Sequence, residues 1–117
     1  MSINDTDSNP GRLNRIRGRA QATNTADYEL LAAPGDGFRN WISSIVVYNS
    51  SASNGTSVEL KSGSTVIWTM PAPPGNGGSI IALPDPIGCN PNEALNFATD
   101  DSVATITVSV AGFTAQA

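Results

Sequence analysis

The chain has 117 residues, the length of one domain with a single modest hydrophobic core. Its composition is 39% hydrophobic and 14% charged, with 11 glycines, 8 prolines and a net charge of −4. This is typical of short strands joined by many turns, and it argues against disorder, which normally accompanies high charge. The chain has no histidine and one cysteine, which excludes the commonest general base, an intrachain disulfide and a cysteine-based zinc site.

Residues 1–19 are predicted to form a basic, flexible N-terminal arm. They hold four arginines against two aspartates, whereas residues 20–117 hold two basic side chains against eight acidic ones. A basic arm on an acidic body is typical of an interaction tail. The N-terminus is polar and no apolar run approaches 20 residues. We therefore expect synthesis in a cytoplasm, no secretion and no membrane partner. The four arginines are Arg12, Arg15, Arg17 and Arg19.

These arginines have three possible roles. They can neutralise the phosphates of a nucleic acid, make bidentate contacts with carboxylates of an acidic protein surface, or stay solvated without a partner. The acidic body would repel a duplex, and no aromatic residue lies between the arginines. The acidic protein surface is therefore the preferred interpretation, and no nucleic-acid partner is expected.

From residue 20 onward the chain alternates between strand patterns and turn residues. Two stretches, 70–78 and 84–92, are rich in proline and glycine and are predicted loops. The regular spacing of strands without helical periodicity predicts that residues 20–117 form one all-β domain, an antiparallel β-sandwich of jelly-roll type. Its strands are expected within 21–31, 38–49, 56–61, 65–69, 79–83, 94–98 and 103–110.

One of these strands is apolar on both faces. Ile45 and Val47 form one alternating set, and Val46 and Tyr48 form the other. A small sandwich can cover only one face of such a strand with its own core. A symmetric neighbour, most simply in a homotrimer, would cover the second face, so these four residues are candidates for a subunit contact.

The search for catalytic and ligand-binding chemistry gives no catalytic, cofactor-binding or metal-binding residues. Cys89 has no histidine to activate it and is interpreted as a packing residue. A glycosidase pair or a calcium site would need acidic residues such as Asp85, Asp100 and Asp101, whose spacing matches neither. Trp41, Tyr48 and Trp68 lie within predicted strands, and the loops 70–78 and 84–92 contain no aromatic residue, so core or subunit packing is favoured over a carbohydrate platform.

The order of segments resembles that of small jelly-roll proteins of tailed bacteriophages, namely head decoration (cement) proteins and head-fibre or tail-fibre modules. The resemblance covers residues 20–113. The segments that carry it are Leu30-Leu31-Ala32-Ala33, Trp41 to Tyr48, Val58 to Ser64 with its Leu-Lys-Ser-Gly-Ser motif, Glu93-Ala94-Leu95-Asn96-Phe97, and Thr107 to Val110.

The resemblance implies a non-enzymatic virion protein without cofactors. Such a protein forms a homotrimer on the outer capsid surface, and its N-terminal arms bind the major capsid protein and stabilise the lattice. The arginines of residues 1–19 would then be the capsid-binding residues. The alternative is a receptor- or carbohydrate-binding module of a phage head or tail fibre, which would use the loops 70–78 and 84–92.

Overall fold

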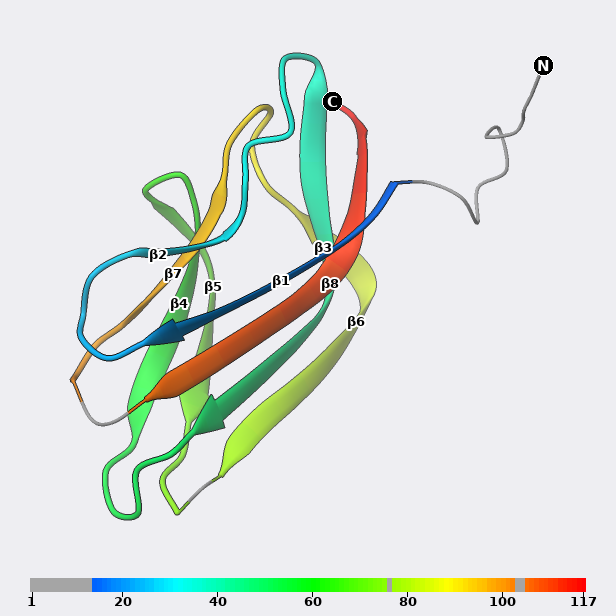
Figure 1. Cartoon of the computed structure of the whole chain (residues 1–117). Helices are drawn as coiled ribbons and strands as arrows, with labels where there is room; N and C mark the ends of the chain where they lie inside the picture. Colours follow the sequence, from blue (N-terminus) through cyan, green and yellow to red (C-terminus); the bar gives the residue numbers. More distant parts are fainter. Residues whose placement is uncertain (1–13, 76, 103–104) are drawn as a thin grey trace.

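The computed structural model describes residues 14–75, 77–102 and 105–117, and within these ranges it contains eight strands. They form two four-stranded antiparallel sheets that pack together as a β-sandwich, which confirms the predicted fold class (Figure 1). Sheet A has the order β1 (Asn14–Ala22), β8 (Ile106–Gln116), β3 (Phe38–Asn49), β6 (Gly78–Gly88). Sheet B has the order β2 (Tyr28–Leu31), β7 (Leu95–Thr99), β4 (Thr56–Ser62), β5 (Thr65–Ala72).

The core lies between the sheets and is built by the predicted alternation. Val58 and Leu60 on β4 are fully buried, as are Leu95 and Phe97 on β7. Burying one side chain of this kind stabilises the fold by about 1.5–3 kcal/mol, because its apolar surface leaves water. The same alternation buries Ile106, Val108 and Val110 on β8.

Strand β3 departs from strict alternation at one point. Ile42 and Ile45 are both fully buried although they are three residues apart. The register with β8 shifts between Ile42 and Ser44, where Ser43 is the extra residue of a β-bulge. The extra residue restores the inward direction of the next apolar side chain. From Ile45 to the end of the strand the alternation is regular.

A buried amide fixes the end of β3. Asn49 is fully buried, and its Nδ2 donates to the carbonyl oxygens of Asn54 at 2.9 Å and Ala72 at 3.0 Å. Its Oδ1 accepts the backbone N–H of Ser51 at 2.8 Å. Both donors and the acceptor of the amide are thus used, which is what a buried polar side chain requires. The network joins the end of β3 to β5 and so links the two sheets.

The predicted boundary between arm and domain is wrong. Residues 14–19, assigned to the arm, lie in β1 and pair in regular register with β8, from Asn14 opposite Thr114 to Ala22 opposite Ile106. The domain therefore includes residues from Asn14 onward. The sequence pattern hides this strand because three of its inward positions, Gly18, Ala20 and Ala22, carry small residues and its outward positions carry arginines, as a solvated tail would. The remainder of the predicted arm, residues 1–13 with Arg12, lies outside the described residues.

The inward side of β1 has little room. A Cβ atom added at Gly18 would lie 2.0 Å from the backbone oxygen of Leu30 and 3.0 Å from a methyl group of Leu31. Real Cβ atoms do not approach a backbone oxygen so closely, and glycine allows this close approach of two backbones. Gly18 is therefore what lets β1 of sheet A lie against β2 of sheet B.

The predicted loop 84–92 is also partly wrong. Strand β6 continues through Pro84 and Pro86 to Gly88, where Ile87 pairs with Ile42 and Gly88 with Trp41. Proline lacks the N–H that a central strand must donate, but an edge strand needs donors on one side only. Because β6 is the edge of sheet A, it accommodates both prolines.

Candidate functional site

The basic and acidic charges of the described residues lie in different parts of the molecule. The strands of sheet A carry four arginines against one aspartate, a net charge of +3. The rest of the described residues carry one lysine against seven acidic side chains, a net charge of −6. The asymmetry predicted along the sequence is thus an asymmetry in space. Sheet A is therefore the basic part of the molecule.

Three of the predicted partner-binding arginines form an arginine row on β1. Arg15, Arg17 and Arg19 are all exposed and alternate with inward positions, so they share the outer face of sheet A. Their cross-strand partners on β8 are Phe113, Ala111 and Ser109. The strand holds the arginines in fixed register on the sheet.

The doubly apolar strand divides as predicted into an inward and an outward set. Ile45 and Val47 are 0% and 1% exposed and belong to the core of this sandwich, so their assignment as subunit contacts is wrong. The reason is that the chain's own second sheet already covers them. Val46 and Tyr48 are 41% and 43% exposed on the outer face of sheet A. They remain candidates for a contact with another molecule.

A further exposed residue was not predicted. Ile80 on β6 is 79% exposed and pairs across the strands with Val46. Together with Tyr48 these residues form an apolar patch on the same face as the arginine row, with β8 between them. The neighbouring pair Ile80-Ile81 was the available signal, because Ile81 packs against the core and leaves Ile80 outside. Only the pairing of β3 with β6 brings Ile80 to Val46.

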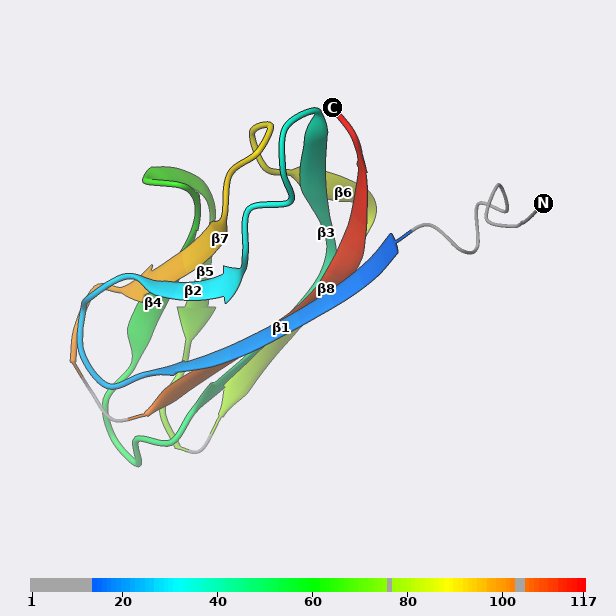
Figure 2. The ribbon, with the colours of Figure 1, turned by 45° about the horizontal axis from the view of Figure 1, so that its top comes forward.

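Strand β8 lies between β1, which carries the arginine row, and β3 (Figure 2). Two hollows, together called the trough, lie along β8, and their floor consists of Ser109, Val110, Ala111 and Gly112. One hollow, of about 330 Å³, includes Arg15, Arg17 and Ser43 in its lining, and a second, of about 340 Å³, includes Arg17 and Arg19. Arg17 lines both hollows. Phe113, the partner of Arg15 on β8, stacks its ring on Trp41 with a centroid distance of 6.2 Å.

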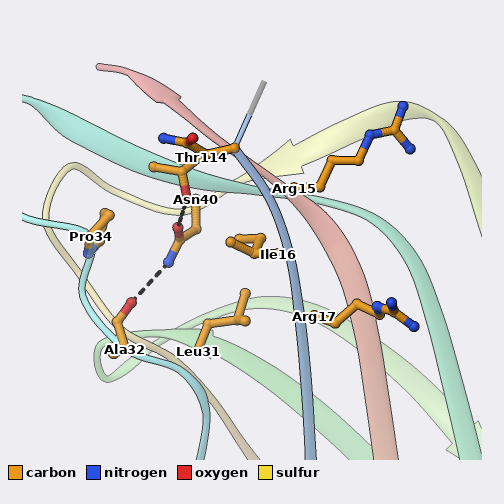
Figure 3. A pocket seen from close by; sticks show the side chains of 9 residues that line it. Arg15, Ile16, Arg17, Leu31, Ala32, Pro34, Asn40 and Thr114 are labelled. Atoms are coloured by element: carbon orange, nitrogen blue, oxygen red, sulfur yellow. Dashed lines mark hydrogen bonds between the residues drawn. The ribbon is translucent and has the colours of Figure 1, made fainter. Parts of the chain in front are cut away.

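A separate cavity of about 560 Å³ lies at the mouth of the sandwich (Figure 3). Ile16 projects from β1 toward Leu31 there, whereas Arg15 and Arg17 point to the opposite side of the strand. Buried Asn40 closes one wall, since it donates to the carbonyl oxygen of Ala32 at 3.1 Å and accepts the hydroxyl of Thr114 at 2.8 Å. The polar groups of this wall therefore satisfy one another.

The single thiol lies in a hydrogen-bonded cluster beneath the β4–β5 turn. Cys89 is fully buried, and this burial raises the pKa of its thiol above the usual value of 9.0, opposed by a hydrogen bond with Ser62. The Ser62 hydroxyl donates to Glu93 Oε1 at 2.7 Å and accepts the backbone N–H of Asn90 at 2.8 Å. A raised pKa keeps the sulfur protonated at neutral pH, the opposite of what a nucleophile needs. These contacts hold the loop after β6 against sheet B.

The aromatic residues divide between the core and the outer face. Trp68 packs against the core from β5, and Tyr28 stacks on Phe97 with a centroid distance of 5.8 Å. Trp41 lies on the outer face, where it stacks on Phe113, and the guanidinium of Arg39 is 5.5 Å from its ring centroid. The rings of Trp41 and Tyr48 therefore belong to the same face as the arginine row.

Comparison of the chain with protein-family models and with curated proteins gives no match. Within the described ranges, no three histidine, cysteine or acidic side chains gather as a metal site would require. In the same ranges, no helix has the length and apolar character needed to cross a membrane.

Proposed function

We propose that the chain is a structural protein of a tailed-bacteriophage virion, without enzymatic activity, that decorates and stabilises the outer capsid surface. The observation that carries this proposal is the outer face of sheet A, where an arginine row and an exposed apolar patch share one surface. Surfaces that combine apolar anchors with arginine are typical of protein–protein contacts. The partners in this proposal are the major capsid protein and further copies of the chain.

The topology supports the jelly-roll form that the resemblance implies. Counting from both ends of the chain, β1 pairs with β8, β2 with β7, β3 with β6 and β4 with β5. A long hairpin rolled up on itself produces these pairs, and two-sheet jelly rolls have this number of strands. The strand pairing thus supports the same kind of protein as the docking face does.

Each part of the face has its own role in this proposal. The apolar patch is the contact between copies in a homotrimer, because its exposed side chains gain most from leaving water. The arginine row binds acidic groups of the capsid. Since β1 is fixed in the sheet, binding does not have to order its backbone, an entropy cost that a flexible arm would carry.

A receptor- or glycan-binding role would rely on the segments 70–78 and 84–92. Parts of both segments belong to strands β5 and β6. Neither segment contains an aromatic residue that could stack on a sugar ring. The outer face of sheet A, with Tyr48 and Trp41, offers more contact surface, and the docking role is therefore preferred.

The proposed capsid contact is tested by cosedimentation with purified heads of the virus that encodes the chain. The wild-type protein is expected to sediment with the heads, and Arg17→Glu with Arg19→Glu to remain in the supernatant, because reversed charges repel an acidic partner. Lys61→Glu reverses one charge on sheet B, where Lys61 contacts Asp27 at 3.0 Å, and is expected to leave binding intact. Binding by the double variant, or failure of the wild type to bind, would refute the proposed role.

The predicted capsid-binding arm, residues 1–19, cannot be tested by deleting all of these residues. A deletion through Arg19 removes most of β1 and exposes the core beneath it. A deletion that ends before Asn14 keeps the strand. In the cosedimentation assay this shorter deletion separates any contribution of residues 1–13 from that of the arginine row.

The trimer contact is tested with Ile80→Asp. Because Ile80 is 79% exposed, an aspartate there should leave the monomer folded, whereas in a trimer contact it would bury a charge. Sedimentation velocity is expected to show trimers for the wild type and monomers for the variant. The Tm of the variant should fall only by the amount that loss of the trimer contact accounts for. Val66→Asp on sheet B, where Val66 is 45% exposed, is the matched control and should remain trimeric. A monomeric wild-type protein contradicts the trimer.

A further inference from the structure

The trough along β8 has a regular spacing of charge on one wall. Arg15, Arg17 and Arg19 occupy alternate positions of one strand, so neighbouring side chains of the row are about 6.7 Å apart. An extended peptide has the same repeat between alternate residues. Carboxylates at every second residue of an extended segment therefore match the arginines one to one. Each pair can adopt the planar, bidentate geometry that arginine makes with a carboxylate.

The remaining walls suit a polypeptide chain. The floor, made of Ser109, Val110, Ala111 and Gly112, has no long exposed side chain, because Val110 is only 3% exposed, so a backbone can lie close to the sheet. Ser43 on β3 also lines the hollow beside Arg15 and Arg17. A segment with small polar residues between its carboxylates complements this lining.

Two arginines of the row, Arg17 and Arg19, are available to an incoming acidic group. Arg17 and Arg19 make no ion pair or side-chain hydrogen bond with another residue in the described ranges. Asp85 is the one acidic residue in the strands of sheet A, and it lies on β6, at the opposite edge from β1. An incoming carboxylate thus meets no acidic side chain on the neighbouring strands β8 and β3.

We infer that the trough binds an extended acidic segment of a partner protein, with carboxylates at alternate residues facing the arginine row. This inference deepens the proposed capsid contact and rests on it. A single-stranded nucleic acid fits less well, because such sites place aromatic rings beside the basic groups for the bases to stack on. On this face the rings of Trp41 and Phe113 stack on each other, and the ring of Tyr48 belongs to the apolar patch.

The test is an NMR titration of the full-length, isotope-labelled protein with two capped peptides of threonine and aspartate. In the first, three aspartates alternate with threonines, and in the second the same three aspartates are consecutive. The two peptides have the same net charge and the same composition. The protein can therefore distinguish them only if its arginines have a fixed spacing. The alternating peptide is expected to bind about threefold to tenfold more tightly and to shift the amide signals of residues 109–113.

Matched variants assign the effect to the row. Arg17→Gln together with Arg19→Gln is expected to weaken the alternating peptide about tenfold, and Lys61→Gln to leave it unchanged. Arg17→Lys with Arg19→Lys keeps the charge but loses the bidentate fork, so it should reduce the preference for the alternating peptide. Ala111→Val raises the floor of the trough and should weaken binding without lowering Tm.

Several outcomes would overturn the inference. Equal affinity for the two peptides, or signal shifts away from the trough, would show that no spaced site exists. Tighter binding of a thymidine oligonucleotide with the same number of charges would assign the trough to nucleic acid. Loss of self-association in the glutamine double variant would assign it to a second copy of the chain. If one of these outcomes occurs and the protein still cosediments with heads, the extended acidic segment is rejected and the virion role stands. If the protein selects the alternating peptide but does not cosediment with heads, the virion role is rejected and the peptide site stands.

Discussion

Replacing Phe97 by alanine is expected to lower the free energy of unfolding by about 3–5 kcal/mol, the range for deletion of a large buried side chain. Phe97 is fully buried at the centre of sheet B. It pairs with Leu60 on β4 and with Tyr28 on β2, and its ring stacks on that of Tyr28. Alanine would leave a cavity between the sheets that neighbouring strands cannot fill without giving up their register.

Urea unfolding at equal protein concentration measures this change. The comparison is best made in the Ile80→Asp background, where self-association does not contribute to stability. Phe38→Ala removes the same ring at the start of β3, where it is 40% exposed, and is expected to cost less than about 1 kcal/mol. Equal effects at the two positions would contradict the central place of Phe97 in the core.

Gly18→Val is expected to lower the free energy of unfolding by about 2–4 kcal/mol, because it forces a side chain into backbone. The first added atom would meet the carbonyl of Leu30 at 2.0 Å, so β1 must move away from β2 or separate from β8. Hydrogen exchange should then show faster exchange of the amides in β1 and in its partner β8. Binding by the arginine row should weaken as well, since the row depends on the position of β1.

This substitution also distinguishes a strand from a free arm. In an arm without contacts, valine in place of Gly18 has no effect on stability. Arg17→Val places the same side chain at the adjacent outward position and is expected to change stability by less than about 0.5 kcal/mol. A similarly small effect of Gly18→Val would contradict the packing of β1 against β2.

The two stability predictions bear on function through the same strand pairings. Phe97 holds sheet B together, and Gly18 lets β1 close the edge of the sandwich where the cavity lined by Ile16 and Leu31 begins. The arginine row and the apolar patch lie on opposite sides of β8, and both keep their geometry only while β1, β8 and β3 remain paired. The docking face is therefore a property of the folded sheet and not of any one segment.

The fold class and most of the core could be predicted because they depend on local patterns. Alternation of apolar and polar residues places Val58 and Leu60 in the core from β4 alone, and the same holds for Ile106 and Val108 on β8. A composition without histidine likewise restricts the acid–base chemistry that the side chains can perform. Such conclusions need only the residue types and the neighbours of a residue in the chain.

Strand β1 and the second half of β6 could not be predicted from local sequence patterns. In β1 the inward glycine replaces the apolar residue that alternation usually shows, since β2 leaves no room for one. In β6 two prolines resemble a loop. They are tolerated because β6 is an edge strand and because residues 83–86 have no partner on β3. Both errors arise because the neighbouring strand, and not the segment itself, decides what a position tolerates.

The amino-acid sequence by itself determined that the arginines and the doubly apolar strand are candidates for contacts with other molecules. Only the tertiary structure decided that they share one face. Arg17 lies beside Ala111, and Val46 lies beside Ile80, through pairings between residues far apart in the chain. A repeat of two residues shows that a side chain alternates in direction, but it does not show which strand lies next to it. That choice is made by burial of the whole core, and it places two separate sequence features on one face of the sheet.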